Sequence, residues 1–313
     1  MIPFKKFLSE VQKVTNGTFF KSFLTLLSGA TVAQIIPTLI SPVLSRIYSP
    51  DNFGLLATYT SVTAVLISIS TLQFESAIIL PKKRGEAKLM LGLSLILPLL
   101  IGLLVLVVIL FGNNILASMI NLGSVGWLFY VLPVFVITGG WYNAMAGWFL
   151  REKQFKTLTW RQVGQSFSTA GSKLLLGLLK LTHFGLILGT LIGQLVSLSV
   201  FVYQLFKREK LKSFLPSITV AKKLIYRYKD FAKYTTWQGF FDAISIALVL
   251  WIFNHYLSIE EVGVYAFTLA IIQKPIALIS TQVGKIYYQR AVSYTHLRAH
   301  ETSLHLVCRL LLE

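Results

Sequence analysis

The stretch SRIYSPDNFGLLATYTS, from Ser45 to Ser61, ends one long apolar segment and begins another within a few residues. Pro50 and Gly54 are strong turn formers, so this stretch predicts a tight turn between two antiparallel helices. A related stretch near the other end of the chain, NHYLSIEEVGVYAFTLA at 254–270, separates two further apolar segments. The sequence therefore predicts that the chain uses the same helical hairpin twice.

The composition is that of a membrane protein. Hydrophobic residues make up 55% of the 313 residues, charged residues only 13%, and the mean hydropathy is +0.68. The segment from Leu89 to Phe111 carries no charge and matches the roughly 20 residues that a helix needs to cross a bilayer. These features predict an all-α polytopic membrane protein. Its predicted spans are 22–48, 53–80, 89–111, 125–150, 162–181, 184–206, 232–256 and 262–284.

The formal charge of +17 is concentrated in alternate connectors between the spans. The connectors at 49–52, 112–124 and 257–261 contain no Lys or Arg. Basic residues favour the cytoplasmic side, so we expect a cytoplasmic N-terminus and no role in binding nucleic acid. The basic segments contain Lys5, Lys6, Lys13, Lys21, Lys82, Lys83, Arg84, Lys88, Arg151, Lys153, Lys156, Arg161, Lys207, Arg208, Lys210, Lys212, Lys222, Lys223, Arg227 and Lys229.

The two hairpin stretches align at four positions with one constant offset. Six predicted spans separate them, and an even number of spans preserves orientation, so the pattern indicates parallel repeats. We expect a six-helix bundle at 1–206, a cytoplasmic basic linker with an amphipathic helix at 207–230, and the first two helices of a second bundle at 231–291. The aligned pairs are Ser49 with Ser258, Asp51 with Glu260, Gly54 with Gly263 and Ala57 with Ala266.

Five of the charged residues inside the predicted spans are candidate site residues, and a charge at mid-membrane costs about 2.5–3.5 kcal/mol if it faces lipid. Lys173 and Lys274 are near mid-span, so they either bind an anionic substrate or form ion pairs with Glu75 or Asp242. Arg46 is nearer a span end, where it either joins that substrate site or extends to the interface. Glu75 and Asp242 either carry a coupling ion, a proton or sodium, or serve as these ion-pair partners.

Two further patterns bear on packing and activity. Gly185, Gly189 and Gly193 recur every four residues, which predicts a face for close helix packing. No nucleotide-binding motif, metal-spaced His/Cys cluster or nucleophilic serine motif occurs in the sequence. We therefore expect no enzyme activity, no cofactor and no metal site. A membrane polysaccharide polymerase, the enzymatic alternative, would be expected to have a large outward loop.

Several segments, in this order along the chain, resemble the lipid-linked oligosaccharide flippases of bacterial surface-polysaccharide synthesis. This family belongs to the multidrug/oligosaccharidyl-lipid/polysaccharide exporter superfamily. The resembling segments are SPVLSRIYSPDNFG, FESAIILPKKRGEAKLML, GWFLREKQFKTLTWRQVGQS, YKDFAKYTTWQGFFDAIS and LSIEEVGVYAFTLAIIQKPIALISTQVGKIYYQRA.

The resemblance implies two six-helix bundles that form a V around a central cavity. It also implies outward transport of an undecaprenyl-diphosphate-linked oligosaccharide across the bacterial cytoplasmic (inner) membrane, for lipopolysaccharide or capsule synthesis. Implied partners are that glycan, membrane lipids, a coupling proton or sodium ion, and other polysaccharide-assembly membrane proteins. A drug/cation antiporter of the same superfamily is the alternative, although basic residues inside the spans favour an anionic substrate.

The segment VSYTHLRAHETSLHLVCRLLLE, from Val292 to Glu313, departs from both the repeat and the family pattern. Its first half resembles the translation of a sequencing adaptor, so we expect 292–313 to be a non-native tail. A cytosolic tail with a short amphipathic helix is the alternative. Members of the family usually have more spans than the eight predicted here, so we also expect the second bundle to be truncated.

Overall fold

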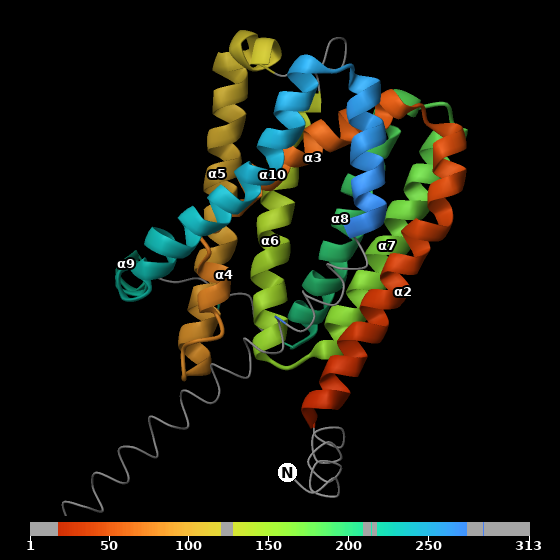
Figure 1. Ribbon diagram of the computed structural model, residues 1–313. Coiled ribbons are helices and arrows are strands. Elements are labelled where there is room, and N and C mark those ends of the chain that lie inside the picture. The colour runs from red at the N-terminus through yellow and green to blue at the C-terminus, as the bar shows by residue number, and fades with distance from the viewer. Residues whose placement is uncertain (1–17, 120–127, 209–213, 215–217, 274–283, 285–313) are drawn as a thin grey trace, which may run out of the picture.

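The computed structural model describes residues 18–119, 128–208, 214, 218–273 and 284, and this part of the chain contains helices and turns but no strands (Figure 1). The all-α prediction is confirmed. The helices are α2 (Thr18–Ile47), α3 (Pro50–Ser70), α4 (Phe74–Ala77), α5 (Arg84–Met119), α6 (Leu132–Arg151), α7 (Phe155–Leu178), α8 (Thr182–Arg208), α9 (Ile218–Arg227), the π-helical turn η3 (Phe231–Thr235), α10 (Thr236–Tyr256) and a helix at 259–273.

Six of the described helical segments are long and apolar enough to cross a membrane. They are Ser28–Ile47, Pro50–Ser70, Arg84–Phe111, Leu128–Arg151, Phe184–Lys207 and Phe231–Tyr256. The chain is therefore a multi-pass membrane protein. Helix α7 occupies the predicted span at 162–181 but is not among the six. The predicted span at 262–284 is described at 262–273 and 284.

The predicted continuous span at 53–80 is wrong in one respect, because the helix breaks between α3 and α4. Leu72 and Gln73 have positive φ angles of 48° and 55°, which turn the chain out of the right-handed helix. Gln73 packs against Gly239 of α10, where a β-carbon would lie 2.9 Å from its side-chain nitrogen. The break thus lies at a contact between the first and second parts of the chain.

Helices α7 and α8 pack closely because small residues line their contact. A β-carbon at Gly189 would lie 2.6 Å from Cγ of Lys173, and a β-carbon at Gly193 would meet Thr169. Gly185 likewise faces the hydroxyl of Tyr48, the residue that follows α2. The predicted glycine face is confirmed. Because Gly189 lacks a side chain, the side chain of Lys173 can pack directly on α8.

The two hairpin turns meet directly at one end of the molecule, called here the hairpin end. A β-carbon on Gly54 would collide with the backbone oxygen of Ile259, and one on Gly263 would collide with the backbone oxygen of Pro50. The residues that align in the sequence repeat are therefore also in contact in space. This end is at the top of Figure 1, where the first turn of α3 lies beside the 259–273 helix.

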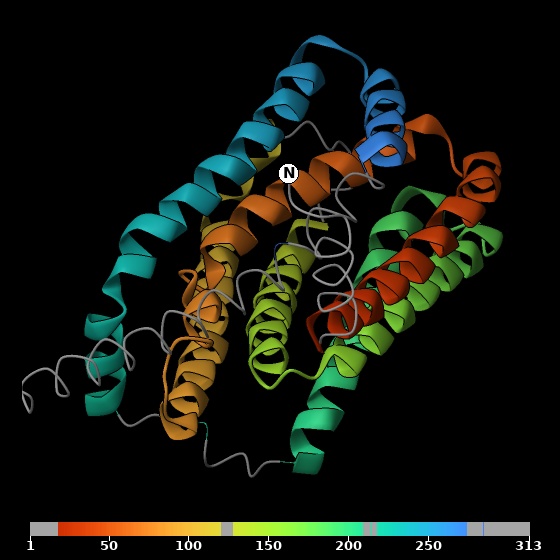
Figure 2. The same ribbon diagram turned by 60° about the horizontal axis from the view of Figure 1, so that its bottom comes forward.

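Side chains extend the contact between α3 and the second repeat. The rings of Phe53 and Phe267 lie 5.0 Å apart, and the indole nitrogen of Trp251 on α10 donates a 3.0 Å hydrogen bond to the hydroxyl of Ser61 on α3. In Figure 2, α10 runs alongside α3, whereas α2 and α7 lie apart from α10 on the other side of the molecule. The end opposite the hairpin end carries Arg84, Arg151 and Arg227, and is called here the basic end.

Candidate functional site

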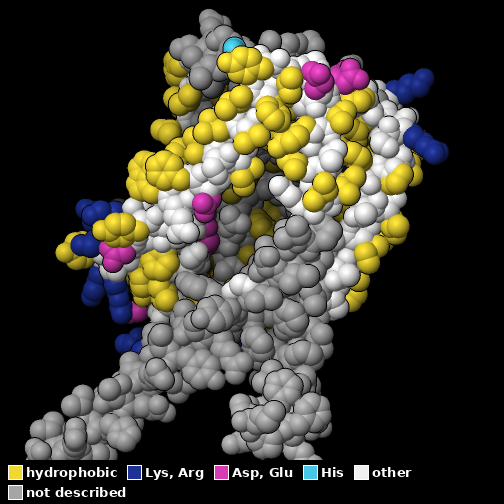
Figure 3. Space-filling view, in the orientation of Figure 1, with side chains coloured by type: hydrophobic (Ala, Val, Ile, Leu, Met, Phe, Trp, Pro, Cys, Tyr) yellow, Lys and Arg dark blue, Asp and Glu magenta, His cyan; other side chains and the backbone are white. Residues whose placement is uncertain are grey.

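A cavity of about 330 Å³ lies between the first repeat and the 259–273 helix. Most of its lining is apolar or small, which suits a pocket that accepts a partly apolar ligand. Figure 3 shows one face of the molecule hollowed near its centre, and the acidic side chains at the left edge of the hollow are not among the residues that line this cavity. The cavity is lined by Pro37, Ser41, Leu44, Phe53, Leu56, Ala57, Thr60, Thr169, Ala170, Lys173, Thr190, Ala266, Phe267 and Ala270.

Four hydroxyl side chains line the cavity: Ser41, Thr60, Thr169 and Thr190. Those of Ser41, Thr60 and Thr190 each donate a 2.8 Å hydrogen bond to a backbone oxygen of their own helix. A hydroxyl that donates within its helix keeps lone pairs that accept hydrogen bonds from a ligand. This lining therefore suits a ligand rich in hydroxyl groups.

Lys173 is the charged residue among the described residues that line the cavity. It is half-buried on α7, and its aliphatic stem packs on Gly189 of α8. Its backbone oxygen accepts a 2.7 Å hydrogen bond from the hydroxyl of Tyr48, which ties this part of α7 to the end of α2. Three helices thus place one ammonium group beside an apolar cavity.

The other predicted site residues lie elsewhere. Arg46 is exposed in the last turn of α2, Asp242 is exposed on α10, and Glu75 lies on α4, and none of the three lines this cavity. The Oε2 atom of Glu75 is buried and has no hydrogen-bond partner among the described residues. Lys274 lies outside the described residues. The roles assigned to all five residues stay predictions.

Arg161, which the sequence places in a basic connector, is a buried cation. Only 4% of this residue is exposed, and its Nη1 atom donates 2.9 Å hydrogen bonds to Gln165 and to Ser197 of α8. Its guanidinium carbon lies 4.2 Å from the ring centroid of Tyr142 on α6. The aromatic face and two oxygen acceptors replace water around the charge, so Arg161 joins α6, α7 and α8.

The described helices define a multi-pass membrane protein with a cavity between the first repeat and the 259–273 helix. The family described as "Polysaccharide biosynthesis protein" matches residues 43–297, and the chain belongs to this family. The comparison with curated proteins finds no match.

Solved structures similar to this one are transporters of the superfamily abbreviated MOP. An outward-facing multidrug resistance MATE family transporter has a TM-score of 0.60 at 19% identity, covering 89% of this chain and 67% of that chain. A MOP superfamily transporter from Pyrococcus furiosus, whose title reports a reversed polarity of the binding pocket, has a TM-score of 0.58 at 18% identity with the same coverage. An inward-facing MATE transporter has a TM-score of 0.54 at 15% identity, covering 93% of this chain and 70% of that chain. At these identities the likeness shows the fold alone.

Proposed function

We propose that this protein is a flippase that moves an undecaprenyl-diphosphate-linked oligosaccharide from the inner to the outer leaflet of the bacterial cytoplasmic membrane. One observation carries the proposal: the cavity between the repeats combines one cation, Lys173, with hydroxyl groups and an apolar lining. Each part matches one part of such a substrate, namely the diphosphate, the sugars and the first lipid units. Membership of a polysaccharide biosynthesis family supports the same substrate class.

In this proposal Lys173 binds the diphosphate. Two unit charges 4 Å apart attract by about 4 kcal/mol at an effective dielectric constant of 20, so one ammonium group contributes substantially to holding an anion inside the membrane. The hydroxyls of Thr60, Thr169 and Thr190 accept hydrogen bonds from the sugars. Lys274 and Arg46 are proposed to assist when the repeats move, and Glu75 or Asp242 to carry a coupling proton or sodium ion.

Transport then requires the repeats to change their relative position. The cavity volume is at the lower end of ligand pockets, so a whole oligosaccharide fits only after the repeats separate further. In the structure Gly54 and Gly263 bring the repeats together at the hairpin end. We propose that this end faces outward and that its opening releases the substrate to the outer leaflet.

A drug/cation antiporter is the second candidate function. The apolar lining by Leu44, Phe53 and Phe267 suits a lipophilic ligand, and two of the similar structures are multidrug resistance transporters. Lys173 disfavours this candidate, because its ammonium group repels a cationic ligand.

The test is complementation of flippase-deficient bacteria with the full-length gene and its variants. Lys173→Gln removes the charge, and losing a charged hydrogen bond of about 2 kcal/mol corresponds to a roughly 30-fold loss of export. Lys173→Arg should retain export, and Lys180→Gln is the matched control, since Lys180 is exposed at the end of α7. Surface polysaccharide and accumulated lipid-linked intermediate are measured together. Normal export by Lys173→Gln would count against the proposed site, and export of cationic dyes without polysaccharide export would favour the antiporter.

A further inference from the structure

We propose that α9 and the turn after it form a binding surface for the anionic headgroups of membrane lipids. The surface consists of Lys222, Lys223, Tyr226, Lys229 and Lys233, and is called here the basic face of α9. All five residues are exposed. In Figure 3, Lys and Arg side chains gather with hydrophobic and acidic ones at the left, where Figure 1 places α9.

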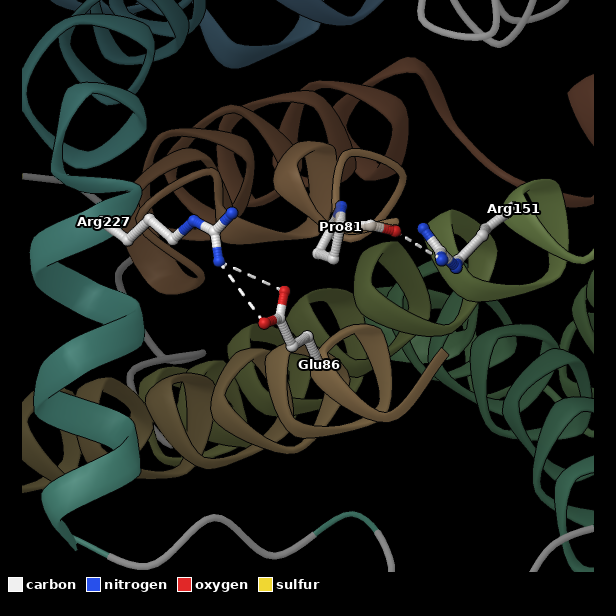
Figure 4. A network of polar contacts seen from close by, with 4 residues as sticks. All are labelled: Pro81, Glu86, Arg151 and Arg227. Carbon is white, nitrogen blue, oxygen red and sulfur yellow. Dashed lines mark hydrogen bonds and ion pairs between the residues drawn. The ribbon is translucent and has the colours of Figure 1, made fainter. Parts of the chain in front are cut away.

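The opposite side of α9 is fixed against the protein. Leu224 is buried in the largest hydrophobic cluster, and Ala221 and Tyr228 pack against the same cluster. Arg227 adds an ion pair, since its Nη1 atom lies 3.3 Å from the carboxylate of Glu86 on α5 (Figure 4). This docking leaves the basic face directed away from the helix bundle.

The docking contact also indicates the depth of α9 relative to a membrane. The candidate span of α5 begins at Arg84, two residues before Glu86, and the span Phe231–Tyr256 begins just after α9. The span of α6 ends at Arg151, which donates a 2.6 Å hydrogen bond to the backbone oxygen of Pro81 in the same region (Figure 4). Three spans therefore reach the interface near α9, which places the basic face at headgroup level.

The spacing and side-chain types of the basic face suit a lipid headgroup. Lys222 and Tyr226 are four residues apart on α9, so they lie on one side of the helix, and Lys229 follows just after its end. The ammonium of Lys229 lies 4.5 Å from the ring centroid of Tyr226, which is 73% exposed. Tyrosine beside lysine is typical of the membrane interface, where the ring contacts acyl chains and both polar groups contact phosphate.

The expected ligand is a lipid and not a soluble phosphate, because apolar side chains accompany the cations. Ile225 is 39% exposed next to Tyr226, and these groups gain contacts only from a ligand that has acyl chains. Lysines near an anionic membrane surface each strengthen binding by roughly fivefold. Four lysines on one face thus distinguish anionic lipids from zwitterionic ones.

The first experiment titrates the purified full chain with dioctanoyl phosphatidylglycerol and counts bound lipid by native mass spectrometry. Replacing Lys222, Lys223, Lys229 and Lys233 with Gln should weaken apparent affinity at least tenfold, whereas the same four changes to Arg should leave it within twofold. The charge-matched control replaces four exposed lysines elsewhere at the basic end and should change affinity less than twofold. Those lysines are Lys82, Lys83, Lys153 and Lys156.

Equal losses in the two glutamine variants would overturn the proposal, because any basic loop would then bind equally well. Competition by glycerol phosphate at the same concentration would overturn it too, since the site would then take a soluble phosphate. A second measurement leaves the lysines intact. Thr219→Cys in a Cys308→Ser background carries a fluorophore in nanodiscs, and brominated phosphatidylglycerol should quench it at least twice as strongly as brominated phosphatidylcholine. Equal quenching by the two lipids would contradict the proposal even if the glutamine variant does not fold.

Discussion

Gly54→Ala should separate the two repeats at the hairpin end. The added β-carbon would overlap the backbone oxygen of Ile259, and the backbone nitrogen of Gly263 would lie 3.2 Å away. Backbone atoms cannot rotate away as a flexible side chain can, so the two turns themselves must move apart. The substitution therefore acts on the contact between the repeats, and less on the fold of either repeat.

The magnitude follows from overpacking. Inserting a methyl group into a well-packed contact costs about 1–3 kcal/mol. A cost of about 2 kcal/mol that falls on the closed arrangement alone changes the ratio of closed to open molecules roughly 30-fold. The higher helix propensity of alanine does not offset this cost, because α3 is helical in both arrangements.

The assay measures access to the cavity from the hairpin end. Ala57 lines the cavity, so Ala57→Cys in a Cys308→Ser background reports access through its rate of reaction with a membrane-impermeant thiol reagent. Gly54→Ala should raise this rate by an order of magnitude. Gly171→Ala on α7 is the matched control, since a β-carbon there meets no atom within 4 Å. If the Gly54 and Gly171 variants react at the same rate, the glycine contact does not hold the repeats together.

Three further predictions concern stability. Hydrogen bonds from the backbone N–H and the hydroxyl of Ser258 lower the pKa of Glu261 in the folded protein. The Glu261 carboxylate therefore stabilises the 259–273 helix fully above its unfolded pKa, and this stabilisation is lost as pH falls through the folded pKa. Acidification should therefore lower the melting temperature of the wild type more than that of Glu261→Gln, and parallel curves would refute this. Arg161→Lys should destabilise the protein by about 1–3 kcal/mol, because an ammonium group cannot reproduce the two hydrogen bonds and the ring stacking. An unchanged thermal transition would show that the contacts of Arg161 contribute little to stability. Glu86→Gln should cost at most about 1 kcal/mol because its pair with Arg227 is partly exposed, but hydrogen exchange in α9 should accelerate. Unchanged exchange would mean that apolar packing by Leu224, Ala221 and Tyr228 is enough to hold the helix.

The helices were predictable because a long apolar segment satisfies its backbone in a membrane mainly as a helix. Other features depend on contacts that no local pattern encodes. Leu72 and Gln73 break a helix without Gly or Pro, so the sequence carries no signal of that turn. Arg161 was assigned to a basic connector because it lies at the edge of a span, yet it points into the bundle. Lys173 lines the cavity and Arg46 does not, which depends on how α2, α7 and α8 face one another.

The contact between Gly54 and Gly263 has the geometry of an isologous dimer interface, because equivalent positions meet each other. In a true homodimer any substitution would appear on both sides, whereas a single chain lets the two sides diverge. They have diverged at the helix starts: the side-chain nitrogen of Asn52 donates to the hydroxyl of Ser49, whereas the hydroxyl of Ser258 donates to the carboxylate of Glu261. Asp51 and Glu260 give both halves a titratable group in the first helical turn, but only the second half has one, Glu261, that accepts a hydrogen bond from the serine at the helix start, so acid acts on the two halves unequally.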